Sequence, residues 1–401
     1  MKKKLKIAYV HMSFVYSGGG EKLVIKEVEW LKKRGHKVDC FSPIVWEDRC
    51  FPELIKKLKV KELLPGFSWL YRKLQMNTMI YFLALLAPIL AWRLRKYDVL
   101  ISEHEPGSWF CFVTWRLFKV PYVLYLAQPT RLLYQRKIDR DVGLQLNRPM
   151  RLSLLLGRIL RPGLFLLDKR VMESAAYAVA NGRHSQKVIE SIYGIKTGNC
   201  PAGAERVKAR SEKRERRKGG DYILLTNRHV PQKKFEYAIE MMKILKVKFP
   251  GLRLMITGGE TRYTKQLREL VRKYDLEKEV VFVGYVKERE MKSWYEKAIV
   301  YVYTAPEEDF GMGVIEAMAA GIPVIAWDSG GPAYTVIDGQ TGFLIEPYKV
   351  KVMREMVEKL LKNKRLRERM GKAGQERAKQ FTWEKHGRCL EKYLIKASKV
   401  T

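Results

Sequence analysis

Short runs of apolar residues alternate with longer amphipathic stretches along most of the chain. Runs rich in β-branched and aromatic residues indicate buried strands, whereas apolar positions spaced three and four apart indicate helices. Because the helical stretches separate the strands, the pattern predicts the α/β class with parallel sheets. The expected strands are residues 5–11, 37–41, 99–102, 121–126 and 177–180, followed by 222–226, 252–257, 280–283, 299–303 and 322–327.

A polar break divides this alternation into two halves. The chain has 401 residues, which is too long for one ordinary domain, and residues 206–220 are highly charged and end in two glycines, as is typical of a linker. We therefore predict an N-terminal domain over 1–205, a linker over 206–220 and a second domain over 221–380. Two doubly wound parallel-sheet domains that face each other across a cleft are the natural assembly of such halves.

The stretch 304–328 combines two features of a ligand site. A strand is followed by an acidic cluster that includes Glu308 and then by a helix that begins near Gly311. Free amides at the start of a helix bind phosphate, whereas carboxylates accept hydrogen bonds from sugar hydroxyls. A nucleotide sugar carries both groups, and we expect it to contact Glu308, Asp309, Phe310, Gly311, Met312, Gly313 and Glu316. The alternative is that the acidic residues only complement the helix dipole and that Glu316 faces solvent.

Glycines and cations at two other strand ends extend this interpretation. Gly18, Gly19 and Gly20 follow the first strand, where glycine lets a ligand approach the backbone closely. Their loop matches neither the dinucleotide-binding fingerprint nor the P-loop. Arg228 and Lys233 follow the strand at 222–226 and place positive charge at another strand end.

Polar residues also follow two buried strands of the first half. α/β folds place their chemistry at the carboxyl ends of such strands, although strand-end turns need polar residues in any case. We select His104, with Glu103, as a candidate for binding the molecule that would accept the sugar. The polar residues are Glu103, His104 and Glu105 after the strand at 99–102, and Gln128 and Arg131 after the strand at 121–126.

The net charge of +34, from 77 Lys and Arg against 43 Asp and Glu, favours an anionic partner. An anionic membrane surface and a nucleic acid are the candidates, and a thermophile-like charged surface is the alternative. Two apolar stretches, 76–92 and 148–167, fit either buried core helices or helices that lie in a membrane interface. No nucleic-acid-binding motif is visible, so we favour the membrane.

Metal and disulfide chemistry receive little support from the sequence. The five cysteines are scattered and none forms a C-x-x-C pair, so we expect no zinc site, no disulfide framework and a reducing cytoplasm. The D-x-D at 139–141 follows no apolar strand, and we assign it no metal. A secretory signal is not evident, and we expect a location at the cytoplasmic face of a membrane.

Five motifs of the second half, in the same order, resemble the donor domain of retaining glycosyltransferases of family 4, which have the GT-B fold. The most specific is the pair of glutamates in E-E-D-F-G-M-G-V-I-E. The first half contributes S-G-G-G-E-K-L-V at 17–24, which resembles the N-terminal loop and helix of the family. The motifs are N-R-H-V-P-Q-K-K-F (227–235), T-G-G (257–259), F-V-G-Y-V (282–286), E-E-D-F-G-M-G-V-I-E-A-M-A-A-G-I-P-V-I-A (307–326), and S-G-G-P with V-I-D-G-Q-T-G-F-L (329–344).

This resemblance implies roles for individual residues. Arg228, Lys233, Glu308 and His104 would be catalytic, and Glu316 would hold the ribose. A C-terminal helix over 381–401 would return to the N-terminal domain. The donor is implied to be a nucleotide-diphosphate sugar used without a cofactor or a metal, by front-face attack. Further donor contacts are implied for the Gly18–Gly20 loop, Gly258, Val283, Gly284 and Tyr285.

Within the family, the first half is most similar to Alg2-type mannosyltransferases, on R-C-F-P-E (49–53), the apolar run near 80–92 and K-Y-D-V-L-I-S-E (96–103). The similarity implies transfer of mannose, with GDP-mannose favoured, to a glycan or lipid-linked acceptor. Gln128 and Tyr334 stand where related proteins have His and Glu. The alternatives are a family 4 enzyme that uses a UDP-sugar on a soluble or polysaccharide acceptor, or a basic scaffold without catalysis that binds a membrane or nucleic acid.

Overall fold

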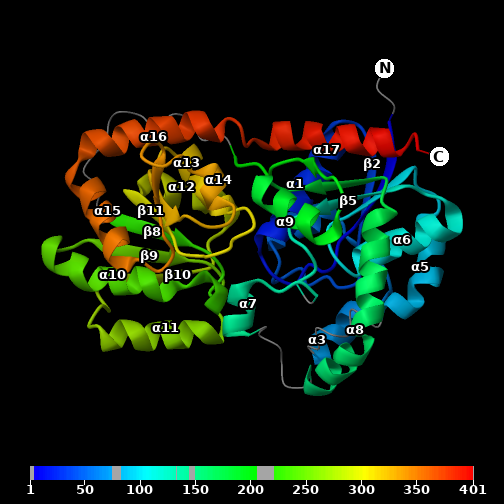
Figure 1. Cartoon of the computed structure of the whole chain (residues 1–401), viewed down its shortest axis with the longest axis horizontal. Coiled ribbons are helices and arrows are strands. Elements are labelled where there is room, and N and C mark those ends of the chain that lie inside the picture. Colours follow the sequence, from blue (N-terminus) through cyan, green and yellow to red (C-terminus); the bar gives the residue numbers. More distant parts are fainter. Residues whose placement is uncertain (1–3, 75–82, 132, 144–149, 206–220, 401) are drawn as a thin grey trace. The chain divides into compact units, whose positions relative to one another are not determined.

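The computed structural model describes residues 4–400 except 75–82, 132, 144–149 and 206–220. The chain divides into two compact units, an N-terminal unit of Met1–Ala202 with Trp383–Thr401 and a C-terminal unit of Gly203–Thr382 (Figure 1). The predicted linker at 206–220 lies outside the described residues.

Among its described residues, the N-terminal unit contains a seven-stranded parallel sheet in the order β3-β2-β1-β4-β5-β6-β7. The order reverses at β1 and β4, and α/β sheets bind ligands at the carboxyl ends of the strands beside such a switch point. The strands are β1 (Lys6–Val10), β2 (Lys37–Ser42), β3 (Lys61–Glu62), β4 (Val99–Ser102), β5 (Tyr122–Leu126), β6 (Tyr177–Ala180) and β7 (Gly198–Asn199).

Helices connect these strands, and their apolar faces contribute to the core. In α1, for example, Leu23, Val24, Val28 and Leu31 are all buried. The helices are α1 (Gly19–Lys33), α2 (Pro52–Leu58), α3 (Phe67–Leu74), α5 (Ala87–Leu94), α6 (Gly107–Phe118), α7 (Lys137–Val142), α8 (Met150–Glu173), α9 (Arg183–Tyr193) and α17 (Trp383–Ala397), with a 3-10 turn, η1, at Leu83–Leu86.

The described part of the C-terminal unit forms a six-stranded parallel sheet in the order β10-β9-β8-β11-β12-β13. Its switch point lies between β8 and β11, which pair in parallel. The strands are β8 (Tyr222–Thr226), β9 (Arg253–Thr257), β10 (Val280–Gly284), β11 (Val300–Tyr303), β12 (Val324–Trp327) and β13 (Gly342–Ile345). The helices are η2 (Pro231–Lys233), α10 (Phe235–Lys248), α11 (Arg262–Lys273), α12 (Glu288–Lys297), α13 (Met312–Ala319), α14 (Pro332–Thr335), α15 (Val350–Lys362) and α16 (Lys364–Ala378).

The last helix, α17, belongs to the N-terminal unit, as predicted, and packs on α1 (Figure 1). Trp30 of α1 donates a hydrogen bond from its indole to Glu384 at 2.9 Å. The buried imidazole of His36 contacts Glu391 of α17 at 3.1 Å and accepts the amide of Leu5 at 3.1 Å. These polar contacts attach the end of the chain to residues near its beginning.

The expectation of no disulfide is wrong. Cys200, just after β7, and Cys389 of α17 form a disulfide with their Cα atoms 5.7 Å apart. They are 189 residues apart in sequence, and only the return of α17 brings them together. Cys40, Cys50 and Cys111 are free and buried. The cysteine pattern therefore no longer supports a reducing compartment.

The structure describes the two apolar stretches, 76–92 and 148–167, only in part. Of the run at 76–92, residues 75–82 lie outside the described part, and α5 buries Ala87, Leu90, Ala91 and Leu94. The stretch 148–167 falls largely within α8, whose early side chains are not described. Among the described residues, no helix has the length and apolar character needed to cross a membrane.

Candidate functional site

The acidic cluster that follows β11 lies at the carboxyl end of the sheet in the C-terminal unit. Glu307 adopts a left-handed backbone with φ 51° and donates its amide to the Ser329 hydroxyl at 3.0 Å. The carbonyl of Glu308 accepts the amide of Gly331 at 2.6 Å. The loop after β12 therefore holds the loop after β11 from two sides, and both loops belong to predicted motifs.

Glycine is required at this crossing of the two loops. A Cβ atom added to Gly330 would lie 2.2 Å from the carbonyl oxygen of Glu308, and one added to Gly331 would lie 2.4 Å from the Cα of Phe310. Both contacts are with backbone atoms, which cannot move aside as a flexible side chain could. The S-G-G-P motif is thus explained by packing against the acidic loop.

Lys233 and Glu308 form an ion pair at the carboxyl end of the sheet. Lys233 ends η2, and its carbonyl accepts the hydroxyl of Thr304 at 2.9 Å. The two charged side chains are 19% and 17% exposed, so they are held in place yet remain reachable from solvent. The cation predicted to meet a leaving group and the carboxylate predicted to hold sugar hydroxyls therefore already neutralise each other.

Glu316 of α13 accepts a hydrogen bond from the Tyr295 hydroxyl at 2.8 Å. Thr226, at the end of β8, contacts the hydroxyls of Tyr295 at 3.2 Å and Tyr301 at 2.8 Å. Burial, together with the charge of Glu316, raises the pKa of Tyr295, so its hydroxyl keeps its proton and acts as a donor. The network fixes one carboxylate oxygen of Glu316. The sequence interpretation missed Tyr295 and Thr226, because their role depends on the contacts between elements.

Gly313 and Gly258 keep backbone close to neighbouring groups in the same region. A Cβ on Gly313 would lie 2.3 Å from the Tyr301 hydroxyl, and one on Gly258 would lie 1.7 Å from the carbonyl oxygen of Asn227. Gly258 also has a φ of 132°, which side-chain-bearing residues rarely adopt. These glycines serve packing whether or not a ligand binds.

The other predicted donor residues differ in how they are presented. Phe310 is buried against Phe381, so only its backbone can face a ligand, and Asp309 is buried as well. Gly311 is the N-cap of α13 with φ 84°, and Met312 and Gly313 open the helix. Arg228 is exposed after β8, Tyr285 is half exposed after β10, and Val283 and Gly284 lie at the end of β10.

In the N-terminal unit, the predicted acceptor-side residues contact one another only in part. Arg131 donates from its Nε to Gln128 Oε1 at 3.1 Å, so the glutamine is engaged with a cation after β5. His104 is partly buried, and burial, together with the positive charge of Arg131, lowers its pKa to about 3. The imidazole of His104 is therefore neutral at physiological pH.

Glu103 lies in a buried network instead of at the surface. Its carboxyl group is 3.2 Å from the Tyr9 hydroxyl and 3.3 Å from Nδ1 of His11. Tyr9 also donates to Glu27 at 2.5 Å, and Glu27 contacts His386 of α17 at 2.7 Å. Of these residues the sequence interpretation found only Glu103, because it placed His11 inside the strand expected at 5–11, whereas β1 ends at Val10.

A second buried acidic pair consists of Glu105, which follows β4, and Asp168 of α8. The Thr130 hydroxyl donates to Asp168 at 3.0 Å, and both carboxyl groups, Glu105 and Asp168, are buried. Burial and the charge of Asp168 raise the pKa of Glu105 to about 8. Glu105 therefore carries a proton at neutral pH.

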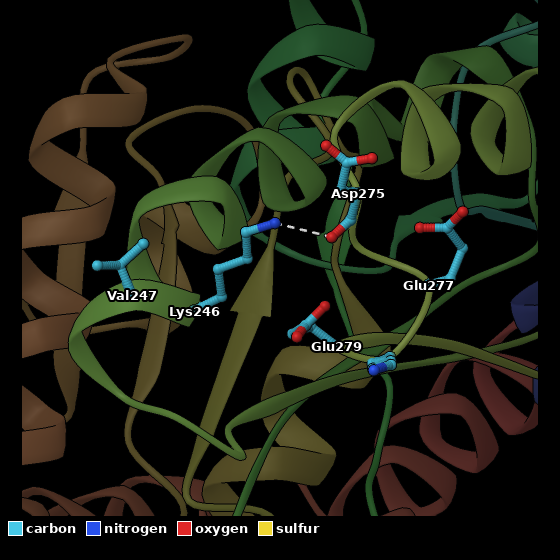
Figure 2. A pocket seen from close by; sticks show the side chains of 6 residues that line it. Lys246, Val247, Asp275, Glu277 and Glu279 are labelled. Atoms are coloured by element: carbon cyan, nitrogen blue, oxygen red, sulfur yellow. Dashed lines mark hydrogen bonds between the residues drawn. The ribbon is translucent and has the colours of Figure 1, made fainter.

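A cavity of about 630 Å³ lies elsewhere in the C-terminal unit (Figure 2). The ammonium group of Lys246 donates to the backbone oxygen of Asp275 at 2.7 Å. Glu279 immediately precedes β10, so the cavity lies at the amino ends of the strands, opposite the candidate site. Its lining residues are Lys246, Val247, Asp275, Glu277, Lys278 and Glu279.

Among the described residues, no group of three or more His, Cys, Asp and Glu side chains could hold a metal ion. Asp139 of the D-x-D accepts Nε of Arg136 at 2.8 Å and helps to cap α7. The first aspartate of this motif therefore has a local structural role.

Residues 207–377 match the family model described as Glycosyl transferases group 1. The Alpha-1,3/1,6-mannosyltransferase ALG2 of Mus musculus is 30% identical over 193 residues, which are 45% of this chain and 46% of that protein. The matched segments span less than half the length of the curated relatives.

Two solved structures resemble almost the whole chain. Sucrose-phosphate synthase from Thermosynechococcus elongatus has a TM-score of 0.76 at 19% identity, over 96% of this chain and 98% of that one. Anabaena Alr3699/HepE in complex with UDP-glucose has a TM-score of 0.72 at 17% identity, over 97% and 99%. At these identities the likeness concerns the fold alone, and it confirms the predicted GT-B fold.

Proposed function

Because residues 207–377 match the family model described as Glycosyl transferases group 1, we propose that the chain is a retaining glycosyltransferase of that family. It moves a hexose from a nucleotide-diphosphate sugar to a hydroxyl group of a glycan or lipid-linked acceptor. The observation that carries the proposal is the arrangement of Lys233, Glu308 and Glu316 at the carboxyl end of one parallel sheet. This arrangement offers a cation for phosphate and two carboxylates for hydroxyls.

Charge determines the role of each residue in the proposed reaction. Breaking the bond between sugar and diphosphate leaves increasing negative charge on the diphosphate, which Lys233 and Arg228 stabilise electrostatically. When Lys233 turns to the phosphate, Glu308 is released to accept hydrogen bonds from sugar hydroxyls. The pair therefore exchanges one internal contact for two contacts with the donor.

Glu316 holds the ribose, with its orientation set by the Tyr295 hydroxyl at 2.8 Å. The amides that open α13 suit a phosphate group. Val283, Gly284 and Tyr285 at the end of β10 receive the base. Because the cationic side chains meet the leaving group, the proposed reaction requires no metal ion.

The mechanism we propose is front-face attack with retention. A donor phosphate oxygen takes the proton of the acceptor hydroxyl, and the protein positions both substrates. Glu308 is the carboxylate of the donor site beside the sugar. It is paired with Lys233 and binds sugar hydroxyls once Lys233 turns to the phosphate. His104, neutral at physiological pH, is the candidate contact for the acceptor.

Mannose is the favoured sugar, because the ALG2 protein of Mus musculus, a mannosyltransferase, is 30% identical over the matched segment. GDP-mannose is therefore the first donor to test. A UDP-sugar is the second, since Anabaena HepE was solved in complex with UDP-glucose.

A donor panel of GDP-mannose, UDP-glucose and UDP-N-acetylglucosamine tests the proposal through release of nucleoside diphosphate and through thermal shift. We expect at least one donor to stabilise the protein and to be turned over without added metal. If no donor binds or is turned over, the proposed activity is wrong.

A lipid-linked acceptor would place the protein at the cytoplasmic face of an anionic membrane, in keeping with its net charge of +34. Co-sedimentation with vesicles that contain phosphatidylserine, at physiological salt, checks this part separately. Vesicles of phosphatidylcholine alone are the control. Equal and negligible binding to both would remove the membrane from the proposal.

A further inference from the structure

The buried network of the N-terminal unit contains two carboxyl groups, Glu27 of α1 and Glu103 after β4, joined through the hydroxyl of Tyr9. Each is at most 1% exposed. Placing two ionised carboxylates so close together without water would be costly, so one of them must hold a proton. The question is which one.

The contact distances of the two carboxyl groups differ systematically. Glu27 lies 2.5 Å from the Tyr9 hydroxyl and 2.7 Å from Nε2 of His386. Glu103 lies 3.2 Å from the same hydroxyl and 3.3 Å from Nδ1 of His11. Charge-assisted hydrogen bonds are shorter than neutral ones. The negative charge therefore lies on Glu27.

His386 explains this choice. Its Nδ1 lies 3.0 Å from the carbonyl oxygen of Pro201, which can only accept, so Nδ1 carries a proton. The short contact of Nε2 with Glu27 then needs a second proton between the two groups, and an imidazolium beside a carboxylate supplies it. Glu27 thus has a charged partner on one oxygen and the Tyr9 hydroxyl on the other.

Glu103 has no comparable partner. Burial raises its pKa, and the charge of Glu27 raises it further. Burial also lowers the pKa of His11, so its ring is neutral, and its Nδ1 lies 3.3 Å from Oε2 of Glu103 without a hydrogen bond. A neutral acid beside a neutral imidazole accounts for both of the longer contacts.

The position of Glu103 gives its protonation a consequence. A Cβ atom added to Gly20 would lie 4.0 Å from Oε2 of Glu103, so this oxygen lies close to the Gly18–Gly20 loop, which the structure places at the N-cap and first turn of α1. An ionised carboxylate there would repel a phosphate group that approaches the loop, and burial would leave that repulsion unscreened. Glu21 lies at the same turn but is partly exposed, so water screens its charge.

We propose that His386 holds the negative charge of this network on Glu27, so that Glu103 stays neutral beneath the Gly18–Gly20 loop and lets the loop accept the donor's phosphates. The last helix of the chain is then a positioning element for donor binding. The inference rests on the proposed function in one respect, the approach of donor phosphates to this loop.

The groups that surround Glu103 come from five neighbouring elements. Its ionisation would add a third negative charge to a region that already contains Glu21 and Glu27. Donor binding is therefore expected to weaken on the alkaline side, as Glu103 loses its proton. The titratable neighbours are Tyr9 and His11 at the end of β1, Glu21 and Glu27 on α1, Cys40 on β2, Tyr125 on β5, and His386 on α17.

Infrared spectroscopy tests the location of the proton independently of any activity. We expect a neutral-carboxyl carbonyl band that disappears in Glu103→Gln. The matched control is Glu105→Gln, which removes a different buried acid and should leave the Glu103 band in place. If Glu103→Gln removes no neutral-carboxyl band, the charge assignment is wrong, whatever the protein catalyses.

Donor kinetics test the consequence. For whichever donor the panel identifies, His386→Gln should raise KM about tenfold, a loss of about 1.4 kcal/mol, with kcat nearly unchanged. Glu103→Gln should keep the normal KM and lose the alkaline rise. The double variant His386→Gln with Glu103→Gln should recover the normal KM, because a neutral residue beneath the loop no longer depends on His386.

The control is His36→Gln, because His36 also joins α17 through Glu391 at 3.1 Å but does not contact Glu103. It should lower stability without raising the KM for the donor. Failure of the double variant to recover would overturn the inference and leave His386 a structural role. If His386→Gln does not fold, Glu27→Gln takes its place, with the same recovery expected. If the wild type binds no donor, the proposed function fails while the infrared result still decides the location of the proton.

Discussion

The two units of this protein carry similar parallel sheets but present their polar residues in opposite ways. In the C-terminal unit, Lys233 and Glu308 are partly exposed at strand ends. In the N-terminal unit, the polar residues at the corresponding strand ends, Glu103 and Glu105, are buried. We propose that the first arrangement contacts a ligand directly, whereas the second sets charge and position from beneath. On this proposal, a residue after a strand end serves a site without touching its ligand.

The largest expected effect lies in the exposed pair. Lys233→Ala should lower kcat for transfer by about 100-fold to 1,000-fold, because a preorganised charge opposite the leaving group is lost. Glu308→Ala should abolish transfer while the fold remains intact. Nucleotide release, followed alongside circular dichroism, measures both.

The matched control is Lys234→Ala, which removes the adjacent cation and its ion pair with Glu236 at 3.5 Å. This variant should retain near-normal transfer. If Glu308→Ala is unimpaired, or if both lysine variants lose activity equally, the exposed pair does not have the assigned role.

The next effect concerns packing in the same unit. Gly258→Ala should destabilise the protein by about 3 kcal/mol or more, because its Cβ would lie 1.7 Å from the Asn227 carbonyl oxygen at a φ of 132°. Gly251→Ala is the control, since Gly251 has a φ of 84° but no atom within 4 Å of an added Cβ. It should lose only about 1 to 2 kcal/mol. Equal losses in urea denaturation would contradict this reading of Gly258.

The disulfide is a second difference between the two units. Among the described residues, the N-terminal unit contains a disulfide and the C-terminal unit does not. Cys389→Ser should lower the stability of that unit by about 3 kcal/mol, because the bond restricts the unfolded chain. Scanning calorimetry with and without dithiothreitol measures this. Reductant should reproduce the loss in the wild type and have no further effect on the variant; a wild type indifferent to reductant would refute it.

A smaller effect is expected from pH. The pKa of Glu105 is raised to about 8, so the folded state keeps a proton that the unfolded state releases near the ordinary pKa of 4.5. Its stabilising contribution is full below the unfolded pKa and is lost as pH rises through the folded pKa. The free energy of unfolding should therefore fall between about pH 4.5 and 8, and less steeply in Glu105→Gln. Urea denaturation across this range measures the slopes, and identical slopes would contradict the assignment.

The sequence pattern predicted most of the architecture because the longer strands and helices have clear periodicity. The strand expected at 222–226 coincides with β8, and the one at 99–102 with β4. The strands β3, β7 and β13 were not predicted. β3 and β7 have two residues each and carry no periodic signal, and parallel pairing to a longer neighbour creates them. β13 has four residues and pairs in parallel with β12.

The candidate site was predictable to the extent that its residues are close in sequence. Glu308 and Glu316 lie on one loop and the helix that follows it, so their spacing reveals them. Glu27 and His386 form a hydrogen bond although they are 359 residues apart in sequence. The disulfide spans 189 residues. Contacts of this kind arise only from the folded topology, and no local pattern encodes them.

The most direct test of the donor assignment is a calorimetric titration of the wild type, Glu308→Gln and Glu316→Gln with a nucleotide sugar and with the matching nucleoside diphosphate. The account predicts that Glu316→Gln weakens binding of both ligands by a similar factor, about tenfold, since the ribose is common to both. Glu308→Gln should weaken only the ligand that carries the sugar. If both variants bind both ligands as tightly as the wild type, these carboxylates do not recognise the donor.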